Sequence, residues 1–473
     1  MLLPRTSFPR MFPARWTLAS ILAATILPLC GACAASPGPD LHGVDQARAR
    51  LQSDTGLRER AVDSALAAAT FDSAWRTVGT SLEGRGVTRI DWAAVRRELA
   101  PRAARARSDV ELRGVIDDML RQLGESHFAI LPAPPSPHAE GGSRDGGTLG
   151  SAGVAVRFVD RDLVVWRVDS AGAARRAGVV PGWRVERIDT FTPPAVGAAD
   201  SVGLKRLGVL TGALGALRGP AGSRVQLVMR DPAGRLHDVS FARDTLRGPL
   251  ARFGNLPPLP ASLQFERRSL GDGRCVGLIR FEYWMPPVMP ALDTAVDASR
   301  GCAGIVLDLR GNLGGVAAMM MGAAGHFLSE PKTLGTMRTR GEEMRFAANP
   351  RRVTAAGAAV EPFGGPLAIV IDGLSASTSE MFAAGLQALG RARVFGERSA
   401  GQALPAIATR LPTGDVLMHV VADFVAADGS RIEGRGTVPD ERVPLLVADV
   451  LAERDAPLAA ALGWIERARP ARP

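Results

Sequence analysis

The chain has 473 residues, enough for two or three domains, and its content of 46% hydrophobic and 22% charged residues excludes an intrinsically disordered protein. The formal net charge is +9, but the basic residues are scattered and no Lys/Arg run is interleaved with aromatic residues, which argues against a nucleic-acid partner. No group of Cys and His residues has the spacing of metal ligands.

Residues 1–35 have the composition of an export signal. Three arginines precede the apolar run WTLASILAATILPL, which is short for a membrane span. Small residues follow in CGACAAS, and two processing routes remain open: cleavage by signal peptidase, or lipidation of Cys33 in an imperfect lipobox with Cys30 at its first position. Either route predicts an exported chain in the periplasm or cell envelope, where only a lipid anchor would attach it to the membrane.

A small helical domain is predicted to follow a tether at residues 36–43. Within residues 44–131, segments such as FDSAWRTVGTSL and ELRGVIDDMLRQLG repeat apolar residues three and four positions apart, as amphipathic helices do. Residues 132–149 are rich in Pro, Gly and Ser and predict a linker or flap.

Residues 150–247 change to a β-rich pattern. AGVAVRFVDRDLVVWRV predicts short alternating strands, SAGAARRAGVVPGWRVERID predicts a short helix, a turn and another strand, and a hairpin is expected across DPAG. This pattern resembles a PDZ domain, with GVAV as the carboxylate-binding loop and its strand. The resemblance implies a groove that binds an extended peptide by its C-terminus; another small β-rich insert is the alternative.

Strands and helices alternate through residues 263–470, which predicts an α/β domain with a largely parallel sheet and helices on its faces. Cys275 and Cys302 precede two of the apolar strands, CVGLIRF and AGIVLDL. If these strands are parallel neighbours, both thiols lie at the same end and can form a disulfide in an oxidising compartment. Two separate buried thiols are the alternative.

Candidate catalytic residues lie at the ends of predicted strands and in one segment far from these strands in the sequence. LDLRGNLGG places Gly314 and Gly315 between a buried strand and a helix, where backbone N–H groups can approach a ligand closely. IDGLSASTSE places serines at the next such junction, and SRIEGRGTVPDERV carries Glu433. LGESHFAI, with Ser126 and His127, lies at the end of the predicted helical domain.

Taken in order, these segments resemble the tricorn and C-terminal-processing serine peptidase family. The matching pieces are LGESHFAI, the PDZ-like segment, GIVLDLRGNLGG, SASTSEMFAAGLQALGRARVFGERSAG and IEGRGTVPD, and they cover nearly all of the chain after the export signal. The resemblance implies an α/β, ClpP/crotonase-like catalytic core with an N-terminal helical domain and an inserted PDZ-like domain.

One branch of this family activates its serine with a lysine, which follows a glycine 25 residues beyond the nucleophile. Here Gln402 occupies that place, and an amide has no titratable nitrogen. The chain has only two lysines, Lys205 in the PDZ-like part and Lys332 outside every motif. The resemblance therefore implies the tricorn-like branch, in which a histidine is the base.

In that branch, a nucleophile, a base and two supporting residues act together; the matching residues are Ser377, His127, Ser126 and Glu433. Ser377 begins a predicted helix, where N–H groups and the helix dipole favour developing negative charge. The resemblance implies oxyanion donors at Gly315 or Gly314 and at Thr378, and it needs no metal or organic cofactor. Each residue also has a plainer interpretation: a helix cap, a structural histidine, a surface carboxylate and a tight turn.

These residues predict an exported serine peptidase that hydrolyses peptide bonds in exported or misfolded proteins or peptides through an acyl-enzyme. Peptide or protein substrates are its expected partners. The alternative is a catalytically silent protein of the same fold that binds peptides in the PDZ-like groove. We expect Asp308 and Arg310 to make a structural ion pair or turn contacts instead of taking part in chemistry, and Ser375 and Ser379 to be structural as well.

Overall fold

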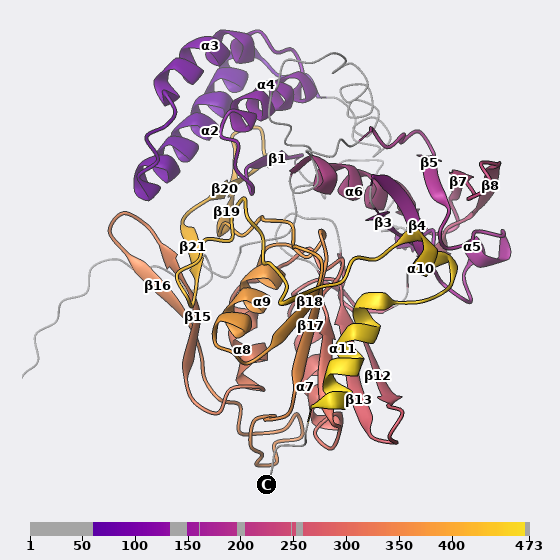
Figure 1. Ribbon diagram of the computed structural model, residues 1–473. Coiled ribbons are helices and arrows are strands. Elements are labelled where there is room, and N and C mark those ends of the chain that lie inside the picture. The colour runs from indigo at the N-terminus through magenta and orange to yellow at the C-terminus, as the bar shows by residue number, and fades with distance from the viewer. Residues whose placement is uncertain are drawn as a thin grey trace, which may run out of the picture.

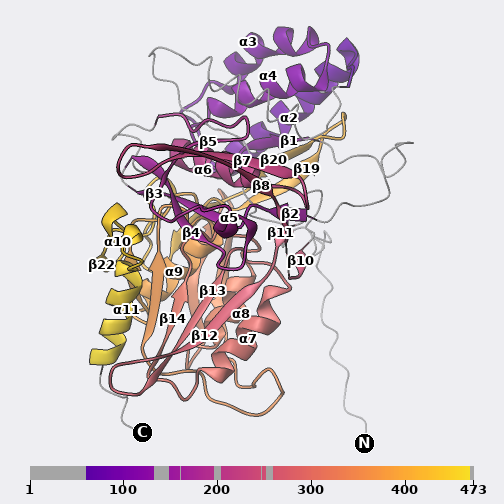
Figure 2. The same cartoon turned by 90° about the vertical axis from the view of Figure 1, so that its right-hand side faces the viewer.

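The computed structural model describes residues 60–132, 149–159, 161–195, 204–246, 248–251 and 259–468 (Figure 1). The predicted export signal with Cys33, the tether and most of the predicted linker lie outside these residues. Within them, no helix combines the length and the apolar character needed to cross a membrane. The described part of the chain has a mixed α/β architecture with a helical layer, a β-rich unit and a central sheet (Figures 1 and 2).

The first helices pack into a layer on top of the core. They are α2 (Ser64–Arg85), α3 (Trp92–Ala104) and α4 (Asp109–Arg121). Each begins after a residue whose side chain accepts a hydrogen bond from the first turn: Asp63, Asp91 and Ser108. Their apolar faces, which include the buried Phe71, share one hydrophobic cluster with Leu417 and Val420 of the core.

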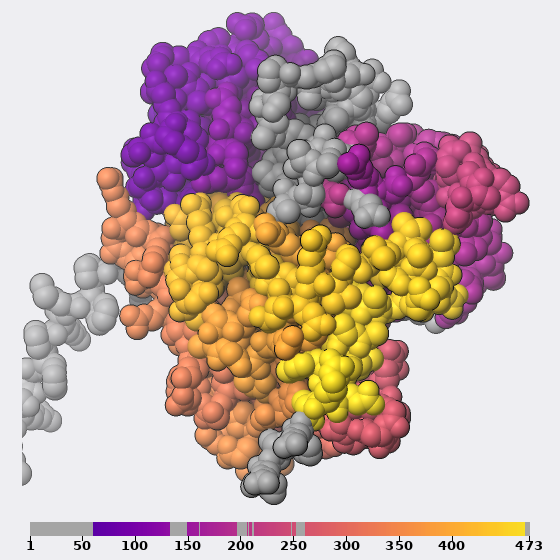
Figure 3. Space-filling model, in the orientation of Figure 1, coloured from indigo at the N-terminus to yellow at the C-terminus, as the bar shows by residue number. Residues whose placement is uncertain are grey.

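A short strand strengthens this docking. β1 (Ala129–Leu131) follows His127 closely and pairs antiparallel with β20 (Val416–Val420), which pairs in turn with β19 (Ala406–Arg410). The turn of the β19–β20 hairpin lies in the sequence LPTGDV. In the space-filling view the indigo helical layer lies directly on the orange and yellow parts of the core (Figure 3).

The region from 149 to 251 contains two small sheets. One has antiparallel strands in the order β3-β4-β5-β7-β8, and the other has the order β6-β2-β9. The elements are β2 (Leu149–Ser151), β3 (Val154–Val159), β4 (Asp162–Val168), α5 (Ala173–Arg176), β5 (Arg184–Ile188), α6 (Leu204–Leu217), β6 (Arg218–Pro220), β7 (Arg224–Arg230), β8 (Leu236–Ala242) and β9 (Asp244–Thr245). The hairpin expected across DPAG is β7–β8, and α6 packs against β3.

The central sheet has the order β12-β13-β14-β17-β18-β22, and all neighbouring pairs except β12–β13 are parallel. Its strands are β12 (Leu263–Ser269), β13 (Cys275–Phe281), β14 (Gly304–Asp308), β17 (Leu367–Ile371), β18 (Arg393–Gly396) and β22 (Glu441–Arg442). β14 and β17 are buried along their whole length, which explains their nearly continuous apolar sequences.

Helices cover both faces of this sheet (Figures 1 and 2). One face packs against α7 (Val288–Ala298), α8 (Met319–Gly325) and α9 (Thr378–Ala388), and the other against α11 (Ala456–Arg467). The segment LLVADVLAERDAPLAAALGWIERA, whose apolar residues predict one C-terminal helix, forms two helices instead. α10 (Val447–Leu451) ends first, and the Asp455 side chain then caps α11 ahead of Pro457, which suits a first helical turn and not a helix interior.

The remaining strands lie at the margins of the core. β10 (Leu250–Ala251) pairs with β11 (Leu259–Pro260), and a sheet that the sequence did not predict has the order β16-β15-β21. Its strands are β15 (Lys332–Arg338), β16 (Glu343–Ala348) and β21 (Asp423–Ala426). At the opposite end of the sheet from Ser377, Cys275 opens β13 and Cys302 lies just before β14. Because these strands are parallel neighbours, the two sulfurs meet in a disulfide.

Candidate active site

Ser377 occupies the junction between the buried strand β17 and α9. Its backbone has φ 56° and ψ −119°, a left-handed conformation that is strained for a residue with a Cβ atom. The side chain is 1% exposed, and its Oγ atom has no hydrogen-bond partner among the described residues. The strained backbone and the unpaired hydroxyl together favour a reactive serine over a purely structural one.

A buried carboxylate that sequence reasoning did not assign holds the backbone at this position. Glu380 Oε2 accepts hydrogen bonds from the N–H groups of Ser377 at 2.9 Å and Gln402 at 2.8 Å. Its Oε1 accepts from the Gly401 N–H at 2.6 Å and the Ser399 hydroxyl at 2.5 Å. Burial raises the pKa of Glu380 to about 7, against the effect of these hydrogen bonds. The Ser-x-x-Glu spacing of a capping box was the available signal.

Gln402 lies directly beside the candidate nucleophile. Its carbonyl accepts the Ser377 N–H at 2.8 Å, and its side chain is buried. The position that carries the lysine in the Ser–Lys branch is therefore part of the site, but here it holds an amide that cannot accept a proton at ordinary pH.

The predicted base and its supports form a connected chain. Ser126 Oγ lies 2.7 Å from His127 Nδ1 and donates its proton to Glu433 Oε2 at 3.0 Å. Glu433 Oε1 also accepts the Ser126 N–H at 3.0 Å. Since the only hydroxyl proton of Ser126 goes to Glu433, its oxygen accepts from His127 Nδ1–H, and the lone pair of the imidazole is on Nε2.

Burial shapes the protonation of this chain. His127 is 3% exposed, and burial lowers its pKa to about 4, so the ring is neutral near pH 7. Burial raises the pKa of Glu433, against the effect of hydrogen bonds from Ser126 and the Ala403 N–H. His127 also has φ 61°, so its backbone is held in a left-handed conformation.

Adjacent residues of one loop link the predicted base to the predicted nucleophile through hydrogen bonds. Ala403 N–H donates to Glu433 Oε2 at 2.8 Å, while the carbonyl of its neighbour Gln402 accepts the Ser377 N–H. The structure thus brings Ser377, Glu433, Ser126 and His127 into one network, although they are far apart in sequence. It places no hydrogen bond between the His127 ring and Ser377 Oγ. Catalytic hydrogen bonds are often long in free enzymes and shorten when substrate binds.

The predicted oxyanion loop abuts the start of α9. Gly314 has φ 96° and Gly315 has φ 146°. A Cβ atom on Gly314 would lie 2.7 Å from Ser377 Cβ and 3.2 Å from the Thr378 nitrogen, so only glycine permits this approach. The Thr378 hydroxyl donates to the Gly315 carbonyl at 2.9 Å. The Gly314 N–H donates to Asn312 Oδ1 at 3.0 Å.

Trp284 supports this loop and was also missed by sequence reasoning. Its N–H donates to the Gly314 carbonyl at 2.8 Å, and its carbonyl accepts the Val316 N–H at 2.8 Å. Its indole Nε1 donates to Ser379 Oγ at 2.9 Å, which gives Ser379 the structural role expected for it. No local sequence pattern marks a tryptophan for such a role.

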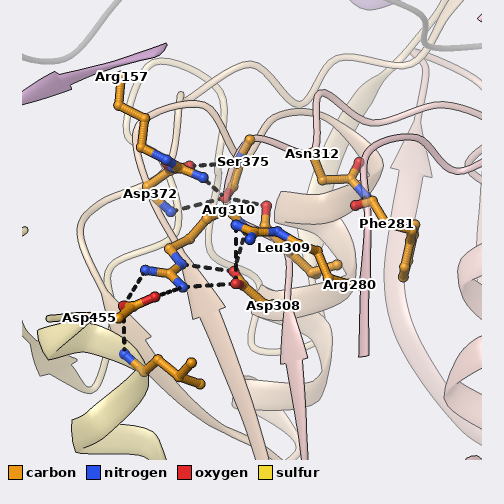
Figure 4. A network of polar contacts seen from close by, with 12 residues as sticks. Arg157, Arg280, Phe281, Asp308, Leu309, Arg310, Asn312, Asp372, Ser375 and Asp455 are labelled. Atoms are coloured by element: carbon orange, nitrogen blue, oxygen red, sulfur yellow. Dashed lines mark hydrogen bonds and ion pairs between the residues drawn. The ribbon is translucent and has the colours of Figure 1, made fainter. Parts of the chain in front are cut away.

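A polar network joins the loop that carries Gly314 to the loop that carries Ser377 (Figure 4). The expected ion pair is present: Arg310 Nε and Nη2 each lie 2.8 Å from an oxygen of Asp308. The Asp372 carboxylate accepts the Gly311 N–H at 3.0 Å, and Ser375 Oγ donates to the Leu309 carbonyl at 2.8 Å. These bonds join the β14–α8 loop to the β17–α9 loop. Among the described residues, no group of His, Cys, Asp and Glu could hold a metal ion.

Comparisons with known proteins identify the family that the core matches. The model of peptidase family S41 matches residues 275–443. The carboxyl-terminal-processing protease of Picosynechococcus sp. is 24% identical over 374 residues, which cover 78% of this chain and 82% of the relative. Carboxyl-terminal-processing peptidase 2, chloroplastic, of Arabidopsis thaliana is 24% identical over 383 residues, or 79% of this chain and 68% of the relative.

Solved structures show a shared fold. The photosystem II D1 C-terminal processing protease superposes with a TM-score of 0.54 at 21% identity, over 80% of this chain and 93% of that chain. Mature CPAF in complex with lactacystin superposes with a TM-score of 0.52 at 13% identity, over 85% of this chain and 98% of that chain. Residues 275–443 therefore form a domain of peptidase family S41, and the chain is homologous to carboxyl-terminal-processing proteases, which are serine peptidases.

Proposed function

We propose that the chain hydrolyses peptide bonds with Ser377 as nucleophile and His127 as general base, in the manner of the tricorn-like branch. The observation that carries this assignment is the buried Ser377 Oγ, which has no hydrogen-bond partner among the described residues and lies on the same network as the His127–Ser126–Glu433 chain. The presence of Gln402 in place of a lysine supports a histidine base over a Ser–Lys pair.

The mechanism follows from the hydrogen-bond directions. As a substrate carbonyl approaches, His127 Nε2 takes the proton of Ser377 Oγ, and the oxygen attacks the carbonyl carbon. The imidazolium that forms donates a hydrogen bond from Nδ1 to Ser126 Oγ. Ser126 in turn donates to the Glu433 carboxylate, and the negative charge of this carboxylate stabilises the imidazolium. His127 then gives its proton to the leaving amine, and water resolves the acyl-enzyme by the same steps in reverse order.

The oxyanion of the tetrahedral intermediate is assigned to the backbone N–H groups of Gly315 and Thr378. Three features support this location: the glycine loop touches Ser377, Thr378 begins α9, and the positive end of the helix dipole lies there. Oriented backbone dipoles of this kind stabilise developing charge without any rearrangement during the reaction.

The wider organisation is part of the same proposal. We assign residues 44–131 to a helical domain that supplies the base, residues 150–247 to a PDZ-like domain that binds substrate C-termini, and residues 263–470 to a ClpP/crotonase-like core. The five-stranded sheet with α6 against β3 is compatible with a PDZ-like unit. Export to the periplasm or cell envelope, with Cys33 as a candidate lipid anchor, is supported by the sequence of residues 1–35.

A fluorophosphonate probe tests the nucleophile. We expect the probe to label the folded chain, Ser377→Ala to abolish labelling and peptide hydrolysis, and the exposed Ser329→Ala to leave both unchanged. Folded wild-type protein that is neither labelled nor active would instead indicate the silent peptide-binding alternative. Full hydrolysis by His127→Ala would show that the base is misassigned even with Ser377 correct.

A further inference from the structure

Arg85 is a buried cation that joins two parts of the chain. It lies in the last turn of α2, and its side chain is 1% exposed. Nη1 donates to Glu125 Oε2 at 2.8 Å, and Nη2 donates to Asp423 Oδ1 at 2.9 Å. One guanidinium group therefore bridges two carboxylates that are almost 300 residues apart in sequence.

The first carboxylate fixes the segment that carries the base. Glu125 directly precedes Ser126 and His127, and its other oxygen accepts from Arg89 Nη2 at 3.0 Å. The two arginines hold the pKa of Glu125 below its usual value despite its burial. Glu125 is therefore an ionised anchor immediately ahead of a histidine whose φ of 61° requires support from its surroundings. On the far side of His127, the β1–β20 pairing supplies the second anchor.

The second carboxylate fixes the segment that carries Glu433. Asp423 is the first residue of β21, and the chain then turns back so that Val425 pairs with Arg431. The turn is closed by a hydrogen bond from the Ala426 N–H to the Ser430 carbonyl at 2.9 Å. Glu433 follows two residues after Arg431. A displacement of Asp423 would thus move the carboxylate that accepts from Ser126.

We propose that Arg85 is a positioning residue that fixes where Ser126 and His127 lie relative to Glu433. The inference rests on the proposed function of these residues and deepens it. Arg85 touches neither the reacting atoms nor the catalytic side chains; it acts through Glu125 on one segment and through Asp423 on the other. The planar fork of arginine suits this role because its two terminal nitrogens can each serve a different carboxylate.

A matched control separates positioning from general stabilisation. Arg113 in α4 is likewise buried, and its Nη1 lies 3.2 Å from both Asp109 and Asp415. It also joins the helical layer to the core, through Asp415 in the β19–β20 hairpin, but neither carboxylate adjoins Ser126, His127 or Glu433. Arg113→Met therefore removes a docking ion pair of the same kind and leaves the catalytic segments anchored.

The first test compares kcat/KM for a peptide substrate at a temperature where circular dichroism shows each variant to be folded. We expect Arg85→Met to lower kcat/KM by about a hundredfold, the size associated with a misplacement of about 1 Å, and mainly through kcat. Arg113→Met should stay within about threefold of wild type despite a lower Tm. Equal losses in the two variants, or a loss below threefold in Arg85→Met, would overturn the proposal. If Arg85→Met does not fold, Arg85→Lys takes its place, and we expect a smaller loss of kcat/KM in this variant.

The second test does not depend on activity. The imidazole signals of His127, identified by their absence in His127→Ala, are followed by NMR through a pH titration. In wild type and Arg113→Met we expect a hydrogen-bonded Nδ1–H and a depressed pKa. In Arg85→Met that proton signal should disappear and the pKa should return towards about 6.5. Unchanged His127 signals in Arg85→Met would refute the positioning role while leaving the proposed function intact. Full hydrolysis by His127→Ala would refute the proposed function, and the NMR result would still decide whether Arg85 holds the ring.

Discussion

Replacement of Gly315 by alanine tests the oxyanion loop most directly. An alanine Cβ at this position would lie 2.3 Å from the Trp284 carbonyl oxygen, 2.8 Å from its carbonyl carbon and 2.9 Å from its nitrogen. All three are backbone atoms held by hydrogen bonds to Gly314 and Val316, so no flexible side chain can move aside. The loop must instead shift by about 1 Å to restore ordinary van der Waals contact.

Two costs add at Gly315. Residues with a Cβ atom avoid the backbone region of Gly315, where φ is 146°, and an alanine there would destabilise the folded state by about 1–3 kcal/mol through backbone strain. Overpacking against Trp284 would add about 1–3 kcal/mol. We therefore expect Gly315→Ala to lose about 2–6 kcal/mol of unfolding free energy. Displacement of an oxyanion N–H should lower kcat by about 100- to 1000-fold.

The assay combines urea unfolding with peptide hydrolysis at a temperature where the variant is folded. Gly322→Ala in α8 is the control, because its Cβ would meet only Met289 Cε, at 3.8 Å. This control should keep full activity and gain slightly in stability, since alanine favours a helix over glycine. A folded Gly315→Ala with kcat/KM within threefold of wild type would refute the assignment of this loop.

Further predictions concern the disulfide, the pH profile and Gln402. Replacing Cys275 and Cys302 by serine should lower the unfolding free energy by about 3.5 kcal/mol, because the disulfide closes a loop of 27 residues in the unfolded chain. Denaturant titration measures this loss. A loss below about 1 kcal/mol would contradict the loop-entropy reasoning. Because burial lowers the pKa of His127 to about 4, kcat/KM should hold at pH 6 and fall only as the pH drops further, so a midpoint at or above 6.5 would contradict a buried neutral base. Gln402→Ala should retain most of the hydrolytic rate in a steady-state assay, since its side chain donates no proton in the mechanism, whereas a loss as large as that of Ser377→Ala would give Gln402 a chemical role.

Local patterns predicted much of the fold because they depend on neighbours in sequence. The amphipathic repeats of the first helices, the DPAG hairpin and the strand–helix alternation of the core all reappear in the structure. The pairing of Cys275 with Cys302 followed once parallel strands were assumed, although two free thiols remained open from the sequence alone. The β15–β16 hairpin was missed, since KTLGTMR and EMRFAA are short and only partly buried and so carry a weak pattern.

The contacts around Ser377 were less accessible to sequence reasoning. The position between a strand and a helix marked the serines of IDGLSASTSE, and the family resemblance selected Ser377 among them. That Glu380 would gather four donors, or that Trp284 would hold the glycine loop, depends on the meeting of segments far apart in the chain.

The separation of the base from the nucleophile has a consequence for the life of the polypeptide. His127 belongs to the part of the chain made first, whereas Ser377 and Glu433 belong to the part made last. A ribosome-bound chain that has folded only its helices therefore holds an imidazole with nothing to activate. The proposed site is therefore complete only after the core has been synthesised, when β1 can pair with β20.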